Sequence, residues 1–294
     1  MNSTKKTYLF AGIAVFFWST VATAFKLALR EYDFIQLIFY ASVVTVIILF
    51  IFLLIQKKID LLFQQSRKEI LFSMFLGAFN PLIYYLILFK AYSLLPAQIA
   101  QPLNMVWAIL LALFSVPLLG QKIGWKSFVA LFVSFIGVIL ISSQGKFSGF
   151  GDTNLTGIFL ALSSSVIWAL YWIFNVRDKR DQIIKLFLNF SFGTLYLFFA
   201  VLFFSDFKLQ SGTGFYAIIY VGIFEIGITY ILWMKAMELS TNNAKIGNLV
   251  FLAPFISLVF IHFILNENIF LTTFIGLIFI VAGIFIQQTD KKQL

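Results

Sequence analysis

The sequence contains no cysteine and only one histidine among its 294 residues. Without cysteine the chain can form no disulfide, and it offers no thiolate ligand and no cysteine nucleophile. A metal site would need several ligands, so the single histidine, His262, is expected to be structural or interfacial. These shortages predict a protein with no metal site and no cofactor.

Charged residues are also scarce, at 11% of the chain, whereas hydrophobic residues make up 61%. Soluble domains use about 25% charged and about 45–50% apolar residues, so a water-soluble core could not absorb this excess. In a helix, about 20 apolar residues cross the roughly 30 Å hydrocarbon layer of a membrane. Runs such as residues 37–55 and 270–286 are apolar on every side, which argues against transmembrane strands with alternating faces. The composition therefore predicts an all-α integral membrane protein.

The apolar runs predict ten transmembrane helices in two sets of five. The spans are expected near residues 7–29, 34–55, 69–91, 97–119 and 125–143, and then near residues 155–176, 183–204, 213–237, 242–264 and 269–288. A polar stretch with several glycines separates the two sets. We therefore expect a first five-helix repeat over residues 1–143, a linker over residues 144–154 and a second repeat over residues 155–294.

The net charge of +9 would raise nucleic acid as a partner for a soluble protein, but here the basic residues stand between apolar runs. With a cytoplasmic N-terminus, ten spans place sixteen of the 21 Lys and Arg residues in cytoplasmic loops and tails. This asymmetry follows the positive-inside rule. It predicts a multi-pass protein of the bacterial inner membrane, with both termini cytoplasmic, a periplasmic linker, and membrane lipid rather than nucleic acid as its surroundings.

The chain also resembles itself at a shift of 145 positions. Residues 77–94 and 222–239 then share seven identities in eighteen positions, including Gly77 with Gly222 and Lys90 with Lys235. Because each set has five spans, an odd number, the second repeat must enter the membrane inverted relative to the first. Inverted repeats with a binding site near the membrane midplane are an architecture of secondary transporters.

This arrangement resembles the ten-helix, EamA-type branch of the drug/metabolite transporter superfamily over nearly the whole chain. Two runs, Asn104-Met105-Val106-Trp107 and Gly120-Gln121-Lys122-Ile123-Gly124-Trp125, are more narrowly similar to bacterial aromatic amino-acid exporters of the YddG-like group. Gly247, Pro254 and Ser257 match the same group, whereas Asn80-Pro81 and Glu225 depart from it. The resemblance implies export of a small metabolite such as an amino acid.

Glu225 is the first candidate for a functional residue. It lies near the middle of the eighth expected span, where a carboxylate costs about 2.5–3.5 kcal/mol on insertion scales. It could recognise an amino group, act as a protonatable switch, or form a structural hydrogen bond. The shift of 145 places Asn80 opposite it, so both repeats carry a polar residue at an equivalent depth.

Helical spacing extends these positions to further candidates, for which packing or contact between helices is the plain alternative. The expected solute-binding residues are Trp18, Thr23, Asn80, Tyr84, Gln101, Asn104, Trp107, Trp168, Tyr171, Glu225, Thr229 and Asn248. Pro102 and Pro254, in the corresponding fourth and ninth spans, are the expected gating or hinge residues, because proline interrupts a helix.

The sequence favours a secondary transporter working by alternating access. It has no GxxxxGK loop, so energy could come from facilitated diffusion, exchange, or protons coupled through Glu225. A pocket of Trp, Tyr, Asn and Gln with one carboxylate suits an amphipathic amino acid or a related zwitterion or cation. A facilitative or proton-coupled drug or amine transporter is the alternative. A membrane-embedded enzyme or a channel is disfavoured, because neither catalytic clusters nor a selectivity filter appear. We expect a monomer or a loose homodimer.

Overall fold

The computed structural model describes residues 3–120, 124–145, 154–239, 246 and 248–289, and within these residues every regular element is a helix. The expected all-α class is therefore confirmed. Seven helices are long and apolar enough to cross a membrane: Lys5–Ala28, Phe34–Ile55, Arg67–Leu94, Ala97–Leu118, Leu155–Asn175, Gln182–Phe204 and Thr213–Met237. Shorter apolar helices over Phe128–Ser142, Leu249–Leu265 and Leu271–Ile286 overlap the other three expected spans. The count of ten spans stays a prediction.

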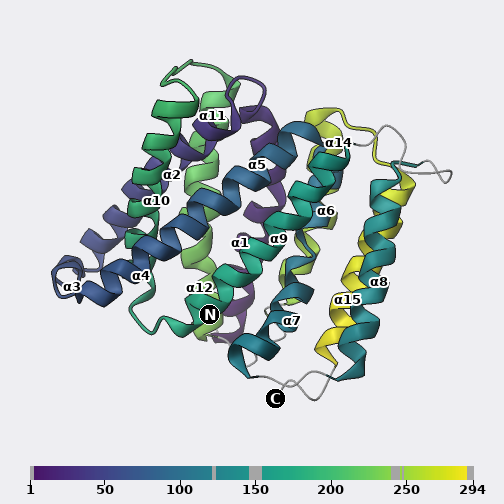
Figure 1. The fold of residues 1–294 in the computed structure, drawn as a ribbon, viewed down its shortest axis with the longest axis horizontal. Helices are drawn as coiled ribbons and strands as arrows, with labels where there is room; N and C mark the ends of the chain where they lie inside the picture. The colour runs from purple at the N-terminus through teal and green to yellow at the C-terminus, as the bar shows by residue number, and fades with distance from the viewer. Residues whose placement is uncertain (1–2, 121–123, 146–153, 240–245, 247, 290–294) are drawn as a thin grey trace. The chain divides into compact units, whose positions relative to one another are not determined.

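The chain divides into two compact units, and each draws helices from both expected repeats (Figure 1). Unit 1 comprises Met1–Leu82 and Arg180–Asn266, and unit 2 comprises Ile83–Lys179 and Glu267–Leu294. Unit 1 holds α1 (Ser3–Ala28), α2 (Phe34–Ile55), α3 (Ile59–Phe63), α4 (Arg67–Gly77), most of η1 (Ala78–Ile83), α10 (Gln182–Phe204), α11 (Thr213–Val221), η2 (Gly222–Gly227), α12 (Ile228–Leu239), η3 (Asn248–Leu252) and α14 (Ala253–Leu265). Unit 2 holds α5 (Tyr84–Leu94), α6 (Ala97–Asn104), α7 (Trp107–Leu119), α8 (Trp125–Ser142), α9 (Leu155–Arg177) and α15 (Leu271–Gln288). Residues 146–153 of the expected linker lie outside the described residues.

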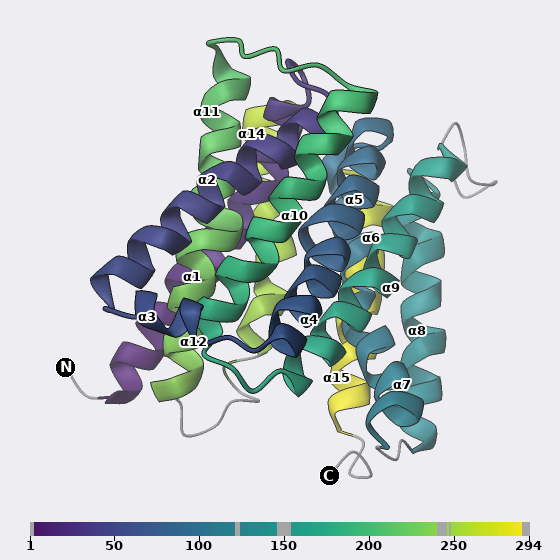
Figure 2. The ribbon, with the colours of Figure 1, turned by 60° about the vertical axis from the view of Figure 1, so that its left-hand side comes forward.

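Within unit 1, α2 lies beside α10, and α1 lies beside α11, α12 and α14 (Figure 2). Glycines bring two further pairs into backbone contact. A Cβ added to Gly77 of α4 would lie 2.5 Å from the carbonyl oxygen of Asn189 on α10. A Cβ added to Gly222 of η2 would lie 2.6 Å from the carbonyl oxygen of Ala41 on α2. Small residues allow this close approach, which is the main source of attraction between helices in lipid.

Two spans of unit 1 contain wide, π-helical turns, η1 and η2. In η1, Asn80 has an extended backbone, with φ −143° and ψ 117°, and is joined to Pro81 by a cis peptide bond. Pro81 has no N–H to donate, so a regular α-helical ladder cannot run through it. η2 carries Glu225. Turns of this kind are rare and often occur at functional sites.

The two prolines expected to act as hinges occupy different positions in their helices. Pro102 lies inside α6, which ends at Asn104, and a tight turn at Met105 and Val106 separates α6 from α7. Pro254 lies in the first turn of α14, directly after the 3-10 helix η3. A proline at that position loses no intrahelical hydrogen bond. Gating by either residue stays a prediction.

In unit 2, α8 and α15 run side by side along their length (Figure 1). Gly137 of α8 and Gly276 of α15 face each other: a Cβ on Gly137 would lie 2.5 Å from the Gly276 carbonyl oxygen, and one on Gly276 would lie 2.6 Å from the Gly137 carbonyl oxygen. The Ser134 hydroxyl also donates to the carbonyl oxygen of Ile280, at 3.4 Å. The two helices therefore meet at their backbones.

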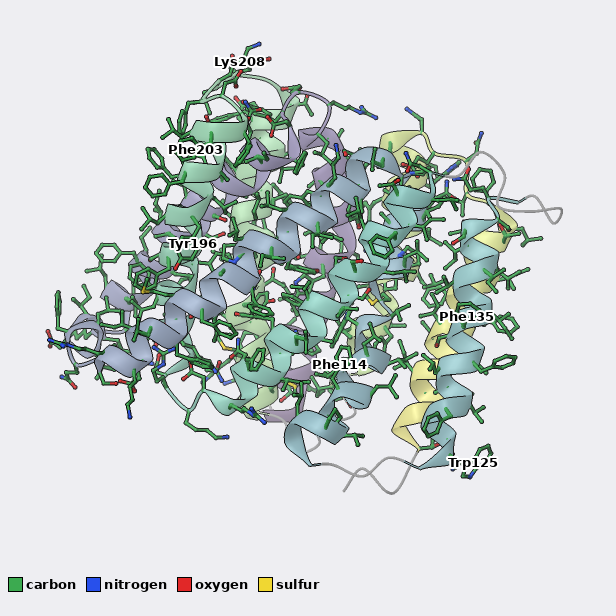
Figure 3. All side chains as sticks on the ribbon, in the orientation of Figure 1. Phe114, Trp125, Phe135, Tyr196, Phe203 and Lys208 are labelled. Atoms are coloured by element: carbon green, nitrogen blue, oxygen red, sulfur yellow. The ribbon has the colours of Figure 1, made fainter. Side chains whose placement is uncertain are left out.

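Large apolar side chains cover the outer faces of several helices. Phe135 of α8 and Phe203 of α10 point away from their helices (Figure 3) and are 59% and 71% exposed. Trp125, which opens α8, is 72% exposed. A water-soluble protein would not leave so much aromatic surface uncovered, but lipid tails accept it. The exposed faces thus fit the membrane expected from the composition.

Asp181 provides a pH-dependent contact at the start of α10. Burial by itself would raise the pKa of this carboxyl, but the hydrogen bond from the Lys58 ammonium (2.7 Å) and those from the Ile184 and Ile183 N–H groups lower the pKa below its ordinary value. A carboxyl with a lowered pKa stabilises the fold at neutral pH, and this stabilisation is lost as the pH falls through the folded-state pKa. We expect Asp181→Asn to lower the thermal unfolding midpoint at pH 7 but much less at pH 3. Asp60→Asn, at an exposed position on α3, is the control and should change neither value.

Candidate functional site

The expected solute-binding residues divide between the two units. Unit 1 contains Trp18, Thr23, Asn80, Glu225, Thr229 and Asn248, and unit 2 contains Tyr84, Gln101, Asn104, Trp107, Trp168 and Tyr171. Asn248 begins η3, but its side chain lies outside the described part of the structure. Most of the other residues fall into two groups of side chains, one in each unit.

In unit 1, Glu225 lies half-buried in η2 next to a tryptophan of α1. The Trp18 indole N–H donates to the Glu225 carbonyl oxygen at 3.1 Å. The same indole packs against two rings of α12, with centroids 5.2 Å from Trp233 and 6.0 Å from Tyr230. We call Trp18, Glu225, Tyr230 and Trp233, with the residues of the next paragraph, the acidic aromatic cluster.

Three more rings, one of them carried by η2 itself, extend the acidic aromatic cluster. Phe224, directly before Glu225, has its ring centroid 4.4 Å from that of Phe17 and 4.6 Å from that of Tyr220. The hydroxyl groups of Tyr220 and Thr20 are 2.6 Å apart and form a hydrogen bond. Six members of the cluster were not expected from the sequence: Phe17, Thr20, Tyr220, Phe224, Tyr230 and Trp233. Trp233 lies eight residues, about two helical turns, beyond Glu225, so extending that helical face would have found it. Thr20 and Tyr220 lie two and five residues from Trp18 and Glu225, away from their faces, so periodicity does not find them.

The backbone of η2 is supplied with hydrogen bonds by neighbouring side chains. The Thr45 hydroxyl of α2 donates to the Gly222 carbonyl oxygen at 2.9 Å, and the Thr229 hydroxyl donates to the Phe224 carbonyl oxygen. Together with the bond from Trp18, three carbonyl groups of the wide turn gain a donor, as buried polar groups require. Thr229 is fully buried, so in this conformation it supports the helix that carries Glu225.

In unit 2, three stacked rings form the second group. The ring of Trp168 lies between those of Tyr84 and Tyr171, with centroids 4.4 Å and 5.6 Å away and interplanar angles of 24° and 23°. Asn104 of α6 links Tyr84 of α5 to Ser164 of α9. Its side-chain oxygen accepts from the Tyr84 hydroxyl at 3.3 Å, and its NH₂ group donates to the Ser164 hydroxyl at 2.8 Å. Tyr84, Asn104, Trp168 and Tyr171, all expected from the sequence, are therefore brought together as a stacked-ring cluster.

The remaining candidates belong to helices that carry these groups or to the helix that follows. Gln101 precedes Asn104 by about one turn of α6 and is half-buried, and Trp107 opens α7 and is also half-buried. Thr23 is buried in α1, five residues beyond Trp18. Within the described residues, no group of three or more His, Cys, Asp or Glu side chains could hold a metal ion.

The stacked-ring cluster allows a test of its hydrogen bond separately from its rings. Tyr84→Phe keeps the ring stack but removes the bond to Asn104, and we expect it to lower stability by about 1 kcal/mol, the usual net value of one buried hydrogen bond. The thermal unfolding midpoint should fall by about 2 °C. Tyr216→Phe, at a tyrosine that is 71% exposed, should leave the midpoint unchanged. An equal fall in both variants would contradict the proposed contact.

Comparison with known proteins identifies the family to which the chain belongs. The model of the EamA-like transporter family matches residues 5–143 and again residues 155–287. The chain belongs to this family. An uncharacterized transporter of Archaeoglobus fulgidus is 25% identical over 304 residues, covering 100% of both chains, and the uncharacterized transporter YvbV of Bacillus subtilis is 26% identical over 202 residues, covering 67% of this chain and 65% of its own.

One relative of this EamA-like transporter carries a substrate in its name. The aromatic amino acid exporter YddG of Ancylobacter novellus is 24% identical over 176 residues, covering 59% of this chain and 61% of its own. A solved crystal structure matches 96% of both chains with a TM-score of 0.66 and 20% sequence identity, a similarity of fold. Family, relatives and apolar helices together identify a multi-pass membrane transporter, whose partners are a small solute and the surrounding lipid.

Proposed function

We propose that this EamA-like transporter is a secondary transporter for a small amphipathic solute with an amino group, an amino acid or a related zwitterion or cation. The observation that carries the proposal is the acidic aromatic cluster, in which the half-buried Glu225 directly follows Phe224 and its backbone carbonyl accepts a hydrogen bond from Trp18. A carboxylate attracts an ammonium group, and aromatic faces attract cations and pack against apolar groups. The cluster therefore combines the two contacts that such a solute needs.

The transporter has ten spans in two inverted repeats, residues 1–143 and 155–294. Two pairs of contacts in unit 1 support this: Gly77 lies against Asn189, and Gly222 lies against Val44. Gly222 follows Gly77 by 145 positions (222 − 77), and Asn189 follows Val44 by 145 positions (189 − 44). This is the shift at which the sequence resembles itself. The π-helical turns η1 and η2 also begin 144 positions apart (222 − 78). The double match to the family adds to this support.

The protein lies in the inner membrane with both termini in the cytoplasm, and it carries its solute by alternating access. Export is the proposed direction, because the named exporter is similar to part of this chain. The alternative is a facilitative or proton-coupled carrier of drugs or amines, in which Glu225 takes up the coupling proton. A carboxylate inside a span is a typical proton relay, so the same residue serves either role. An enzyme in the membrane is the least favoured, since the relatives are named as transporters.

Uptake into proteoliposomes tests the proposal directly. Labelled amino acids, amines and nucleosides would be presented singly, with and without a pH gradient, and empty liposomes would serve as the control. We expect accumulation of at least one solute that has both an amino group and an apolar part. Accumulation only of solutes without an amino group would contradict the proposed class, and accumulation that depends on the pH gradient would favour proton coupling.

A further inference from the structure

The η1 turn carries a buried side-chain amide, that of Asn80. At η1, the Asn80 side-chain oxygen is buried and has no hydrogen-bond partner among the described residues, although only 1% of the residue is exposed. A buried amide oxygen without a partner is destabilising, so such a group in a native protein indicates a bound water molecule or ion.

A second unpartnered amide lies at the same helix crossing. Asn189 of α10 is 0% exposed, and neither its side-chain oxygen nor its nitrogen has a partner among the described residues. The backbone of Asn189 meets Gly77, three residues before Asn80. One turn further along α10, Gly193 meets Pro81, the residue after Asn80. Gly77 and Pro81, which lie before and after Asn80 in the sequence, therefore both contact the part of α10 that contains Asn189.

We propose that Asn80 and Asn189 form a binding site for a small monovalent cation such as Na⁺, held by their side-chain oxygens. Full burial limits the ligand to something small, and the two oxygens need a partner of positive character. Residues 77–81, 189 and 193 carry no carboxylate, so the site lacks the negative charge that divalent cations require. In several secondary transporters, backbone carbonyl groups at an interrupted helix coordinate Na⁺, and η1 is such an interruption.

The surroundings also limit how tightly a cation can bind. Lys185, buried on α10, precedes Asn189 by one turn, and its positive charge opposes a cation at this distance. We therefore expect weak binding, in the millimolar range of extracellular or cytoplasmic salt. The unpartnered nitrogen of Asn189 can donate to a water molecule bound to the cation. A water molecule alone could serve the same atoms, but its effect would not depend on which salt is present.

Salt substitution on the purified full-length protein tests this site. The thermal unfolding midpoint would be followed by intrinsic tryptophan fluorescence in NaCl, KCl and choline chloride at one ionic strength, without any solute. We expect Na⁺ at ten times its half-saturating concentration to raise the midpoint by about 2–3 °C over choline. Because no solute is present, the result is independent of the proposed transport function. Equal midpoints in all three salts would show that the amides hold only water.

Two variants locate the effect, and a third serves as a control. Asn189→Leu, close to Asn in size, should fold and lose the Na⁺ shift, whereas Asn189→Asp should reach half-saturation at a lower Na⁺ concentration at pH 8. Ser257→Ala removes another buried hydroxyl that has no partner among the described residues, on α14 instead of α10, and should keep the full shift. A Na⁺ shift that persists in Asn189→Leu would overturn the proposal. If that variant does not fold, an unchanged Na⁺ titration in Asn189→Asp would overturn it equally.

Discussion

Replacing Glu225 with glutamine is expected to weaken transport of an amino-bearing solute by about ten- to a hundredfold. Glutamine keeps the size and the hydrogen-bonding capacity of the side chain but removes its negative charge. A hydrogen bond to a charged group is worth about 1.5–3 kcal/mol, which corresponds to this loss of affinity. The neighbouring rings of Trp18 and Phe224 remain, so the variant should fold and still bind the apolar part of the solute. The measurement is the concentration dependence of uptake into proteoliposomes.

The same substitution at Glu31 is a matched control, because Glu31 also belongs to unit 1 but is exposed between α1 and α2. Glu31→Gln should transport like the unmodified protein. If Glu225 instead takes up a coupling proton, Glu225→Gln should abolish any dependence on the pH gradient while leaving exchange of solute intact. Unchanged affinity together with an unchanged pH profile would remove both roles proposed for Glu225.

Gly276→Val is expected to have the largest effect on folding. Gly276 of α15 and Gly137 of α8 meet at their backbones, and a Cβ on Gly276 would lie 2.6 Å from the Gly137 carbonyl oxygen and 2.7 Å from the Ile141 side chain. The helices would have to separate, which removes the close packing that holds them together in lipid. Overpacking of this kind costs about 1–3 kcal/mol, and more where the backbone must move. We expect the thermal unfolding midpoint to fall by about 4–6 °C.

Gly12→Ala provides the matched control for this prediction. Gly12 lies in α1, and an added Cβ there would have nothing within 4 Å. Alanine favours a helix over glycine, so the midpoint should stay the same or rise slightly. Detergent-solubilised yield and size-exclusion profiles would be recorded beside the midpoint. A Gly276→Val protein as stable as Gly12→Ala would contradict the backbone contact between α8 and α15.

The sequence predicted the helical class and named the four residues of the stacked-ring cluster, because composition and short-range spacing indicate both. Of the acidic aromatic cluster it named only Trp18 and Glu225. Trp168 and Tyr171, three residues apart on one regular helix, are stacked as their spacing suggests. Asn104 and Tyr84 were both named from the sequence, and their side chains meet although they belong to different helices. These residues lie in α-helical segments, in which the period of about 3.6 residues per turn is kept.

The prediction of shared helix faces was less useful where the helices change their period. A π-helical turn holds about one more residue than an α-helical turn, so side chains beyond it rotate to another face. Glu225 and Thr229 were expected on one face, yet Glu225 is half-buried while Thr229 is fully buried and bonded to its own backbone. Likewise, the turn at Met105 and Val106 separates Trp107 from the helix that carries Gln101. Pro81 marks the interruption at η1, but η2 contains no proline and no other local pattern that marks it.

The central claim, that Glu225 recognises the amino group of a transported solute, can be tested by competition in proteoliposomes. Uptake of a transported amino-bearing solute would be measured against two competitors, its decarboxylated amine and its deaminated acid. With Glu225 in place, the amine should compete about as well as the parent solute, and the deaminated acid should compete at least tenfold less well. In Glu225→Gln this difference should disappear. Equal competition by both analogues in the unmodified protein would contradict the claim.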